Sequence, residues 1–402
     1  MYNILSLDGG GSWAIIQLLT LKDRYGNVSG HEILQKYDLV IANSGGSIVL
    51  AALAENWTID KALTLFKDKD IRESIFSENT FKDRFFPVDY LRLLKLPFGP
   101  KYSSKQKKDS FETLFKEVNK RQMSELPAFI KNDSLKIVVC TYDALNNRAK
   151  FFKSYGTESD DYDSVKLTQA IHGSSNAPVQ YFDFPARFKA KNSEIYYELW
   201  DGALGGFNNP ILAGIIEAFK LGVKLQDIRI VSIGTGNKLM SIKEKNNFWK
   251  WKQIAIKKRR KKLEFNSLKP QAKFFKLTVL NQAKTILYQP PDTANYIAMM
   301  FLKMVSEKTI NEHIVRLSPL IHSDSSTSEQ VEPLINKLYA LDMDITKEEE
   351  IQCLLDCFAM WQKGEILNQP LEFKIKRDND IVFINGNKDY KNGIDKWKSW
   401  GF

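Results

Sequence analysis

A serine in a short turn is the first candidate for chemistry in this chain. Residues 42–46 read Ala-Asn-Ser-Gly-Gly and follow the strand-like run 38–42. A serine on a sharp turn between strand and helix, as in the G-x-S-x-G pattern of hydrolases, exposes its hydroxyl beside a helix N-terminus that favours negative charge. Ala42 and Gly46 are the small elbow residues that such a turn needs around Ser44. The pattern also fits an ordinary turn serine, so the case for a nucleophile depends on further residues.

A glycine loop near the N-terminus is the second candidate. Asp8 is followed by Gly9, Gly10 and Gly11. Consecutive glycines allow backbone N–H groups to point into one space, where they can stabilise an oxyanion or a phosphate. Neither the G-x-G-x-x-G pattern nor the G-x-x-x-x-G-K-[ST] pattern fits here, which argues against a nucleotide-binding loop. The structural alternative is a tight turn between a strand and a helix.

The third candidate is Asp201, which follows a strand predicted at 195–199. In a parallel sheet the C-terminal ends of the strands gather at one edge, so this carboxylate could reach Ser44 and act as its base. A lone Asp-Gly also fits a turn. A Ser-His-Asp triad that uses His172 remains an alternative, although a Ser-Asp dyad leaves fewer residues unexplained. The chain has four histidines, His31, His172, His313 and His322.

The first 55 residues contain two strand–turn–helix units. Strands predicted at 2–7 and 38–42 lead into helices predicted at 13–22 and 47–54, which is typical of parallel βαβ units. Further strands are predicted at 135–141, 195–199 and 228–233. Their apolar character indicates a sheet that is buried on both faces. We therefore expect an α/β fold with a central, mostly parallel sheet flanked by helices.

The rest of the chain suggests how the site is covered and extended. We expect a catalytic domain at 1–300, in which 57–125 forms a cap, and a mostly helical extension at 301–402. A basic segment at 243–276 carries Trp249 and Trp251.

The net charge of +10 favours anionic partners. A phospholipid membrane surface and an anionic activator are the two functional interpretations of the basic segment, and a solvated basic surface is the third. We do not expect nucleic acid as the main partner, because no known binding motif accompanies the basic run. Assembly into a homo-oligomer is also left open.

Cysteines and apolar runs bear on the compartment. Three cysteines argue against a disulfide framework, and Cys353 and Cys357 are expected in a helical core without a metal. The N-terminal residues lack a basic, apolar leader, so we expect no secretory signal. No window of 18 apolar residues predicts a spanning helix. A cytoplasmic protein that associates peripherally with a membrane follows from these expectations.

Six segments, in this order along residues 1–300, resemble the patatin-like phospholipase family. They are DGGG at 8–11, the elbow at 38–46, GPKY at 99–102, SNAP at 175–178 with Tyr181 and Phe182, DGA at 201–203 followed by NNP at 208–210, and SIGTG at 232–236. The resemblance implies a patatin-like three-layer fold and hydrolysis of fatty acyl esters without a metal or another cofactor. It also implies a Ser-Asp dyad of Ser44 and Asp201 and an oxyanion loop at Gly9, Gly10 and Gly11.

The chain departs from the family pattern at three places. Ala42 replaces the first elbow glycine, and Asn43 stands where threonine is common. Trp13 and Ala14 stand where the family often has Arg-Gly. Trp cannot supply a cationic fork, so only the backbone N–H groups of the glycine loop remain as expected donors.

Two functional alternatives accompany the resemblance. Some bacterial members of the family are antiviral effectors that a cyclic nucleotide switches on to degrade membrane phospholipid, and the size, basic charge and C-terminal region of this chain are compatible with that role. The other alternative is a non-catalytic lipid- or nucleotide-binding protein on a degenerate scaffold, which the departures at Ala42 and Trp13 keep open.

Overall fold

The computed structural model describes most of the 402 residues. They are 1–77, 100–156, 164–178, 181–191, 194–238, 290–305, 312–322, 328–369, 375–377, 380–382, 387 and 389–402. The basic segment predicted at 243–276, with Trp249 and Trp251, lies outside the described residues, as does part of the predicted cap.

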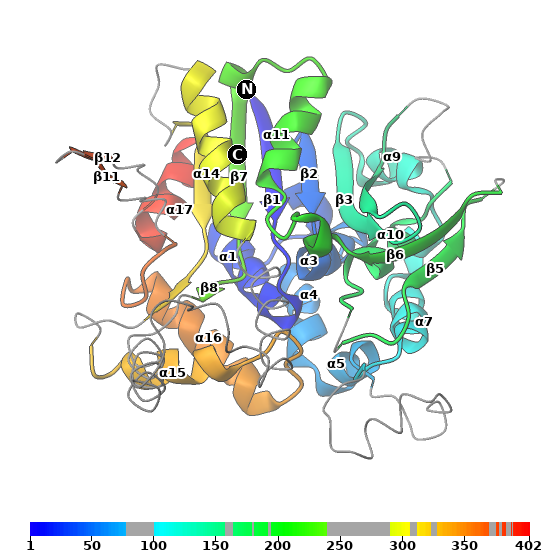
Figure 1. Ribbon diagram of the computed structural model, residues 1–402, viewed down its shortest axis with the longest axis horizontal. Coiled ribbons are helices and arrows are strands. Elements are labelled where there is room, and N and C mark those ends of the chain that lie inside the picture. Colours follow the sequence, from blue (N-terminus) through cyan, green and yellow to red (C-terminus); the bar gives the residue numbers. More distant parts are fainter. Residues whose placement is uncertain are drawn as a thin grey trace, which may run out of the picture.

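An eight-stranded mixed sheet forms the centre of the molecule (Figure 1). Its strands follow the order β5-β6-β3-β2-β1-β7-β9, and β4 pairs with β3 on the other side. Five neighbouring strands are parallel, namely β1 (Tyr2–Leu7), β2 (Leu39–Ala42), β3 (Lys136–Asp143), β7 (Ile228–Ile233) and β9 (Ile314–Leu317). The antiparallel strands are β4 (Arg148–Lys153), β5 (Ala186–Lys189) and β6 (Tyr196–Asp201). The prediction of a mostly parallel sheet is therefore confirmed.

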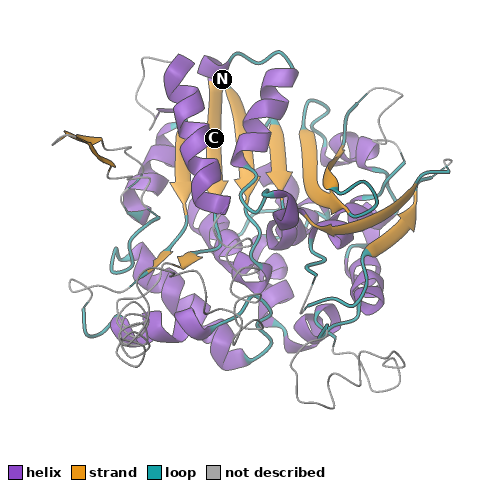
Figure 2. Ribbon diagram, in the orientation of Figure 1, coloured by secondary structure: helices purple, strands orange, loops and turns teal. Residues whose placement is uncertain are grey.

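Helices cover both faces of this sheet, which gives three layers (Figure 2). On one face, α1 (Ile15–Tyr25) and α3 (Ser44–Ala54) pack against alternate strand residues such as Leu5 and Val40. On the other face, α11 (Ile211–Lys220) and α14 (Pro290–Val305) pack against Ile4 and its neighbours. Because successive strand residues point to opposite faces, burial of both faces explains the apolar character of the strands.

The remaining helices lie mainly around the C-terminal ends of the parallel strands or on the β3–β6 side. They are α2 (Gly30–Leu34), α4 (Ile59–Lys67), α5 (Lys69–Ile75), α7 (Ser104–Leu114), α8 (Lys116–Asn119), α9 (Leu126–Ile130) and α10 (Leu167–Ser174). The C-terminal helices are α15 (Glu332–Ala340), α16 (Glu348–Gln362) and α17 (Tyr390–Ser399). In Figure 1 the parallel strands point toward the side where α5, α15 and α16 lie.

The stretch 301–402, expected as a mostly helical extension, also supplies strands. Strand β9 pairs with β7 in the main sheet, and α17 packs against β9. Two small sheets complete the description, one of β8 (Asn237–Lys238) with β10 (Leu320–Ile321) and one of β11 (Ile375–Arg377) with β12 (Asp380–Val382). The sheet thus continues past residue 300 in the described structure.

Local predictions and the structure differ at some element ends. The helix predicted at 47–54 begins three residues earlier at Ser44, and the helix predicted at 13–22 opens with a short 3-10 turn, Gly11–Ala14.

Within the described ranges, no helix combines the length and the apolar composition that crossing a bilayer requires.

Candidate active site

The turn around Ser44 has the geometry of a nucleophile elbow. Strand β2 ends at Ala42, Asn43 is extended, and Ser44 takes a φ of 48° as the first residue of α3. A positive φ at a residue with a side chain is strained, and such strain persists where the surroundings enforce it. A Cβ added to Gly46 would lie 2.6 Å from two carbonyl oxygens at the end of β1. The elbow therefore requires glycine at 46, whereas Ala42 fits as a buried strand residue.

Sheet register brings Asp201 to this elbow. Along β3, Ala42 pairs with Val139, and Asp201 pairs with Thr141 two residues further on. Strand β4 pairs with β3 on one side. On the other side of β3, β2 pairs with residues up to Val139 and β6 pairs with residues from Thr141, so β6 lies just beyond the C-terminal end of β2. Asp201 lies near the C-terminal ends of β2 and β3, but its strand is antiparallel, so the expected parallel direction is wrong. Antiparallel β6 runs toward the C-terminal end of β2 and ends at Asp201.

The Asp201 carboxylate is buried and accepts hydrogen bonds from the Ala203 N–H at 2.9 Å and from the Asn43 side-chain amide at 3.1 Å. The Ser44 hydroxyl lies close enough to lower the pKa of Asp201 as well. Burial raises the pKa of Asp201 above its usual value, and these hydrogen bonds, with the charge of Lys107, limit the rise. A buried carboxylate with an upward-shifted pKa beside a serine hydroxyl is suited to remove its proton.

One turn at the end of α10 holds both members of this pair. The Ser44 N–H donates to the Ser174 hydroxyl at 2.8 Å, and the Asp201 N–H donates to the Asn176 carbonyl at 3.1 Å. Ser174 also lies within 3.4 Å of the Asn43 side-chain oxygen. The predicted SNAP segment at 175–178 begins inside this turn, so its proximity to the elbow has a structural basis.

The glycine loop passes beside Ser44, but its three N–H groups are not equivalent. The N–H of Gly9 donates to the carbonyl of Asn208 at 2.7 Å, so the expectation that Gly9 contributes to an oxyanion hole is wrong. Within the described part of the chain, the N–H groups of Gly10 and Gly11 have no acceptor. Gly11 has a φ of 57° and lines the cavity in front of Ser44. Gly10, by contrast, lines the neighbouring cavity with Asp8 and Thr235.

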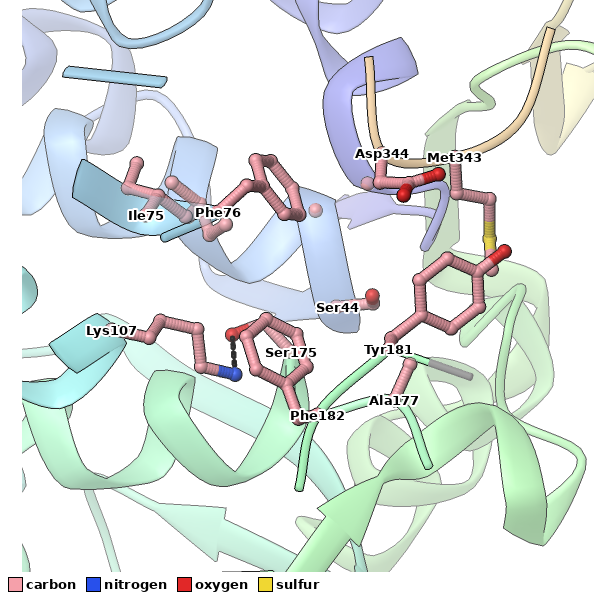
Figure 3. Close-up of a pocket in the computed structure, with 13 residues that line it drawn as sticks. Ser44, Ile75, Phe76, Lys107, Ser175, Ala177, Tyr181, Phe182, Met343 and Asp344 are labelled. Atoms are coloured by element: carbon pink, nitrogen blue, oxygen red, sulfur yellow. Dashed lines mark hydrogen bonds between the residues drawn. The ribbon is translucent and has the colours of Figure 1, made fainter. Parts of the chain in front are cut away.

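The cavity in front of Ser44 encloses about 400 Å³ together with its mouth (Figure 3). Its walls are mostly apolar and include Ile48, Ile75, Phe76, Ala177, Phe182 and Met343. Ile75 and Phe76 come from the predicted cap region, and Met343 comes from the segment between α15 and α16. An apolar cavity next to a hydroxyl suits a ligand with a hydrocarbon part.

The segment between α15 and α16 that carries Met343 is hydrogen-bonded to the residues just after the glycine loop. The N–H of Ser12 donates to the Met343 carbonyl at 2.9 Å, and the indole N–H of Trp13 donates to the Asp342 carbonyl at 2.9 Å. The Tyr181 hydroxyl donates to the Asp342 carboxylate at 2.6 Å. Trp13, which stands where the family often has arginine, therefore anchors a wall of the cavity. Sequence reasoning missed this wall because no local pattern marks it.

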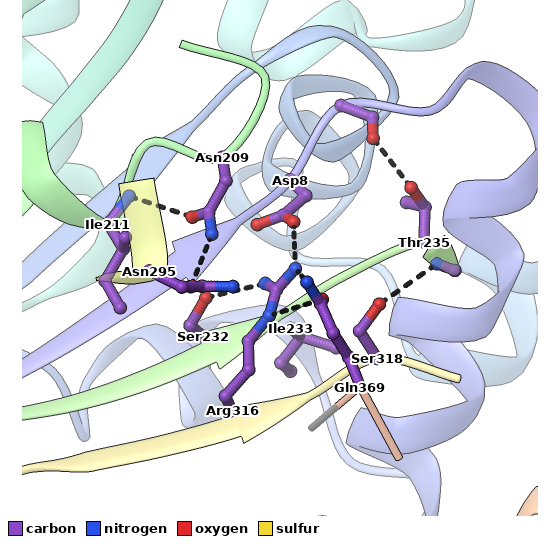
Figure 4. A network of polar contacts seen from close by, with 12 residues as sticks. Asp8, Asn209, Ile211, Ser232, Ile233, Thr235, Asn295, Arg316, Ser318 and Gln369 are labelled. Atoms are coloured by element: carbon purple, nitrogen blue, oxygen red, sulfur yellow. Dashed lines mark hydrogen bonds and ion pairs between the residues drawn. The ribbon is translucent and has the colours of Figure 1, made fainter. Parts of the chain in front are cut away.

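A second buried carboxylate lies on the other side of the glycine loop (Figure 4). The Arg316 guanidinium contacts the Asp8 carboxylate at 2.6 Å and also donates to Ser232 and Gln369. Burial raises the pKa of Asp8 to about 6, although Arg316 opposes the shift. The Thr235 hydroxyl donates to the Gly9 carbonyl at 2.7 Å. This network fixes the loop without reaching Ser44.

The histidine alternative is not formed. In the described structure the ring of His172 contacts the Ser104 hydroxyl at 3.5 Å and makes no hydrogen bond with Ser44 or Asp201. Burial lowers the pKa of His172 well below its usual value, and Lys107 adds to this effect. Among the residues that the structure describes, no group of acidic, histidine or cysteine side chains could hold a metal ion.

Comparisons with known proteins agree with these features. The family model described as Patatin-like phospholipase matches residues 5–215. A cUMP-AMP-activated phospholipase of Escherichia coli is 23% identical over 252 residues, which are 58% of this chain and 64% of that protein. Patatin-like protein 4 of Arabidopsis thaliana is 25% identical over 262 residues, 59% of this chain and 60% of that protein. The chain thus spans about three fifths of the length of these curated relatives.

Two solved structures are also similar to this chain. VipD from Legionella pneumophila has 13% identity and a TM-score of 0.35, with 89% of this chain and 66% of that chain covered. ExoU, solved in complex with SpcU from the type III secretion system of Pseudomonas aeruginosa, has 15% identity and a TM-score of 0.26, with 44% and 38% covered.

Proposed function

Because the chain belongs to the patatin-like phospholipase family, we propose that it is a lipid acyl hydrolase of the phospholipase A type. The observation that carries the proposal is the strained elbow residue Ser44 beside the buried Asp201 carboxylate, whose pKa the Ser44 hydroxyl lowers. The apolar cavity in front of Ser44 supports a fatty acyl ester as the substrate.

The proposed reaction uses two proton transfers through Asp201. Asp201 takes the hydroxyl proton while the Ser44 oxygen attacks the acyl carbonyl, and the N–H groups of Gly10 and Gly11 hold the oxyanion. The proton then goes to the leaving lysophospholipid oxygen, which leaves an acyl-enzyme. Asp201 next takes a proton from the water that attacks the acyl-enzyme, and returns it to the Ser44 oxygen as the ester bond breaks and the fatty acid is released. Loss of one oxyanion donor in such a site raises the barrier by about 2.7–4 kcal/mol.

The test of this proposal is hydrolysis of phospholipid vesicles by the purified chain, read as released fatty acid. Ser44→Ala and Asp201→Asn should each lower the rate by at least about a thousandfold while the protein stays folded. Ser154→Ala is the matched control, because Ser154 is also a buried serine but bonds to Ile137 at the opposite end of β3. Near-normal hydrolysis by a folded Ser44→Ala variant contradicts the proposal.

Regulation by a cyclic nucleotide is a further part of the proposal. It is supported by the Escherichia coli relative, whose name states activation by cUMP-AMP. Hydrolysis should be measured with and without a panel of cyclic dinucleotides that includes cUMP-AMP. A rate that rises with one of them supports a role in antiviral defence, whereas a rate that none of them changes supports a constitutive enzyme.

We also propose that the chain acts on membranes from the cytoplasmic side as a peripheral protein, with catalysis in residues 1–300 and part of 57–125 as a cap. The net charge of +10 supports attraction to anionic lipid. Flotation with neutral and with anionic vesicles, each at low and high salt, measures this attraction. Binding that does not depend on anionic lipid contradicts the proposed electrostatic attraction. Size-exclusion chromatography of the same purified protein reports whether it forms a homo-oligomer.

A further inference from the structure

A buried lysine faces the candidate active site, and no acidic side chain among the described residues is in contact with it. Lys107, on α7, is only 1% exposed and lines the same cavity as Ser44 (Figure 3). Its ammonium donates to the Asn176 side-chain oxygen at 2.8 Å, to the His172 carbonyl at 3.3 Å and to the Ser175 hydroxyl at 3.4 Å. It also lies 3.8 Å from the centre of the Phe182 ring.

These partners are all uncharged, which makes the position of Lys107 costly. Burial of an ammonium is unfavourable unless hydrogen bonds and opposite charges compensate it. Within the described residues, no carboxylate lies at ion-pair distance from Lys107. Burial lowers its pKa well below the usual value, and the more distant Asp201 and Asp183 carboxylates oppose this shift.

The contacts of Lys107 lead directly to both members of the candidate dyad. Lys107 binds the side chain of Asn176, and the carbonyl of Asn176 accepts the N–H of Asp201 at 3.1 Å. The same turn contains Ser174, whose hydroxyl accepts the N–H of Ser44 at 2.8 Å. Any shift of this turn therefore moves the nucleophile and the base together.

We propose that Lys107 is a positioning residue, which fixes the turn behind Ser44 and Asp201 and whose positive charge favours the ionised Asp201 carboxylate. This inference rests on the proposed function of the dyad. It explains why an ammonium is buried among neutral acceptors next to the cavity, since its compensating charge is the base itself. An uncharged side chain of similar length would fill the same space without that effect.

The sign of the expected pH effect follows from the groups around the pair. Cys140 on β3 faces Asp201, whereas His172 on α10 and Asp183 face Lys107. Of these groups and Lys107, only Lys107 lowers the pKa of Asp201 by its charge. Loss of that charge should raise the pKa of the base, so the acidic limb of the kcat/KM profile should move to higher pH.

Two variants separate charge from packing. Lys107→Met keeps most of the stem but loses the charge and the donors, and Lys107→Gln keeps a neutral donor. Lys108→Met is the matched control, because Lys108 is the next residue of α7, is 41% exposed and pairs with Glu112 on the surface. For each variant, the pH dependence is measured for ester hydrolysis and for labelling of Ser44 by a fluorophosphonate, which loses fluoride as the serine oxygen bonds to phosphorus.

For both Lys107 variants, the ratio of the rates at pH 8 and pH 6 should rise about threefold or more relative to wild type, because the base titrates at higher pH. Lys108→Met should keep the wild-type ratio. The inference is overturned if folded Lys107→Gln or Lys107→Met has the same pH 8 to pH 6 rate ratio as the wild type. In that case, labelling of Ser44 in the wild-type protein still leaves the proposed function intact. Absence of Ser44-dependent labelling in the wild type overturns the proposed function and the inference together.

Discussion

The pair of Asp8 and Arg316 makes a prediction in which two opposing effects can be weighed. Burial raises the pKa of Asp8 to about 6 from an ordinary 3.8, even though Arg316 lies at 2.6 Å and opposes the shift. The folded protein therefore holds this proton more tightly than the unfolded chain does. Stability from this group is fully present below about pH 4 and is lost as pH rises toward 6. The difference of about two pKa units corresponds to roughly 3 kcal/mol.

The perturbation is Asp8→Asn, which keeps the shape and removes the titration. Urea unfolding of wild type and variant at several pH values between 4 and 7.5 gives the difference in unfolding free energy at each pH. Relative to the variant, the wild type should lose roughly 3 kcal/mol of stability across this range. Asp60→Asn is the control, because Asp60 is an exposed carboxylate that pairs with Lys22 on the surface. A difference that is constant with pH, or that favours the wild type as pH rises, refutes the reasoning and means that Arg316 outweighs burial.

Three further changes test the elbow, the base and the packing of α5. Gly46→Ala should cost about 2 kcal/mol or more and abolish hydrolysis, because its Cβ would lie 2.6 Å from backbone oxygens; thermal unfolding and rate measurements check this. Asn43→Ala removes the 3.1 Å hydrogen bond to Asp201, so the pKa of Asp201 should rise. Hydrolysis should then fall more at pH 6 than at pH 8. Arg72→Met should lower the free energy of urea unfolding by about 3 kcal/mol, because the buried guanidinium donates to three backbone carbonyl groups. Glu348→Gln should lower it by under about 1 kcal/mol, because Glu348, which pairs with Arg72, is 74% exposed.

The elements around Ser44 could be predicted because their signals are local. Apolar runs of strand length, followed by small residues and an apolar helix, predict a buried parallel sheet with an elbow at its edge. The structure has β1, β2, β3 and β7 where the strands were expected, within a few residues. The helix after the elbow begins earlier than predicted, at Ser44 itself.

Strand direction and hydrogen-bond partners could not be predicted, because both depend on distant residues. Nothing in 195–201 indicates that this strand pairs antiparallel with β3. Gly9 looks equivalent to Gly10 and Gly11 in the sequence, yet the carbonyl of Asn208 takes its N–H. Lys107 is one lysine among several on α7, and only the fold places it beside Asp201.

The two buried carboxylates at the glycine loop differ in where their compensating cation lies. Asp8 has Arg316 in direct contact at 2.6 Å, so its charge is neutralised locally and it can serve only to hold the loop. Asp201 has no cation in contact within the described structure, and its side-chain hydrogen bonds come from two amides, those of Asn43 and Ala203. A guanidinium bound directly to Asp201 would occupy the carboxylate oxygens that the Ser44 hydroxyl needs. A cation that acts across the turn, as Lys107 does, keeps the carboxylate ionised and leaves its oxygen for the Ser44 hydroxyl.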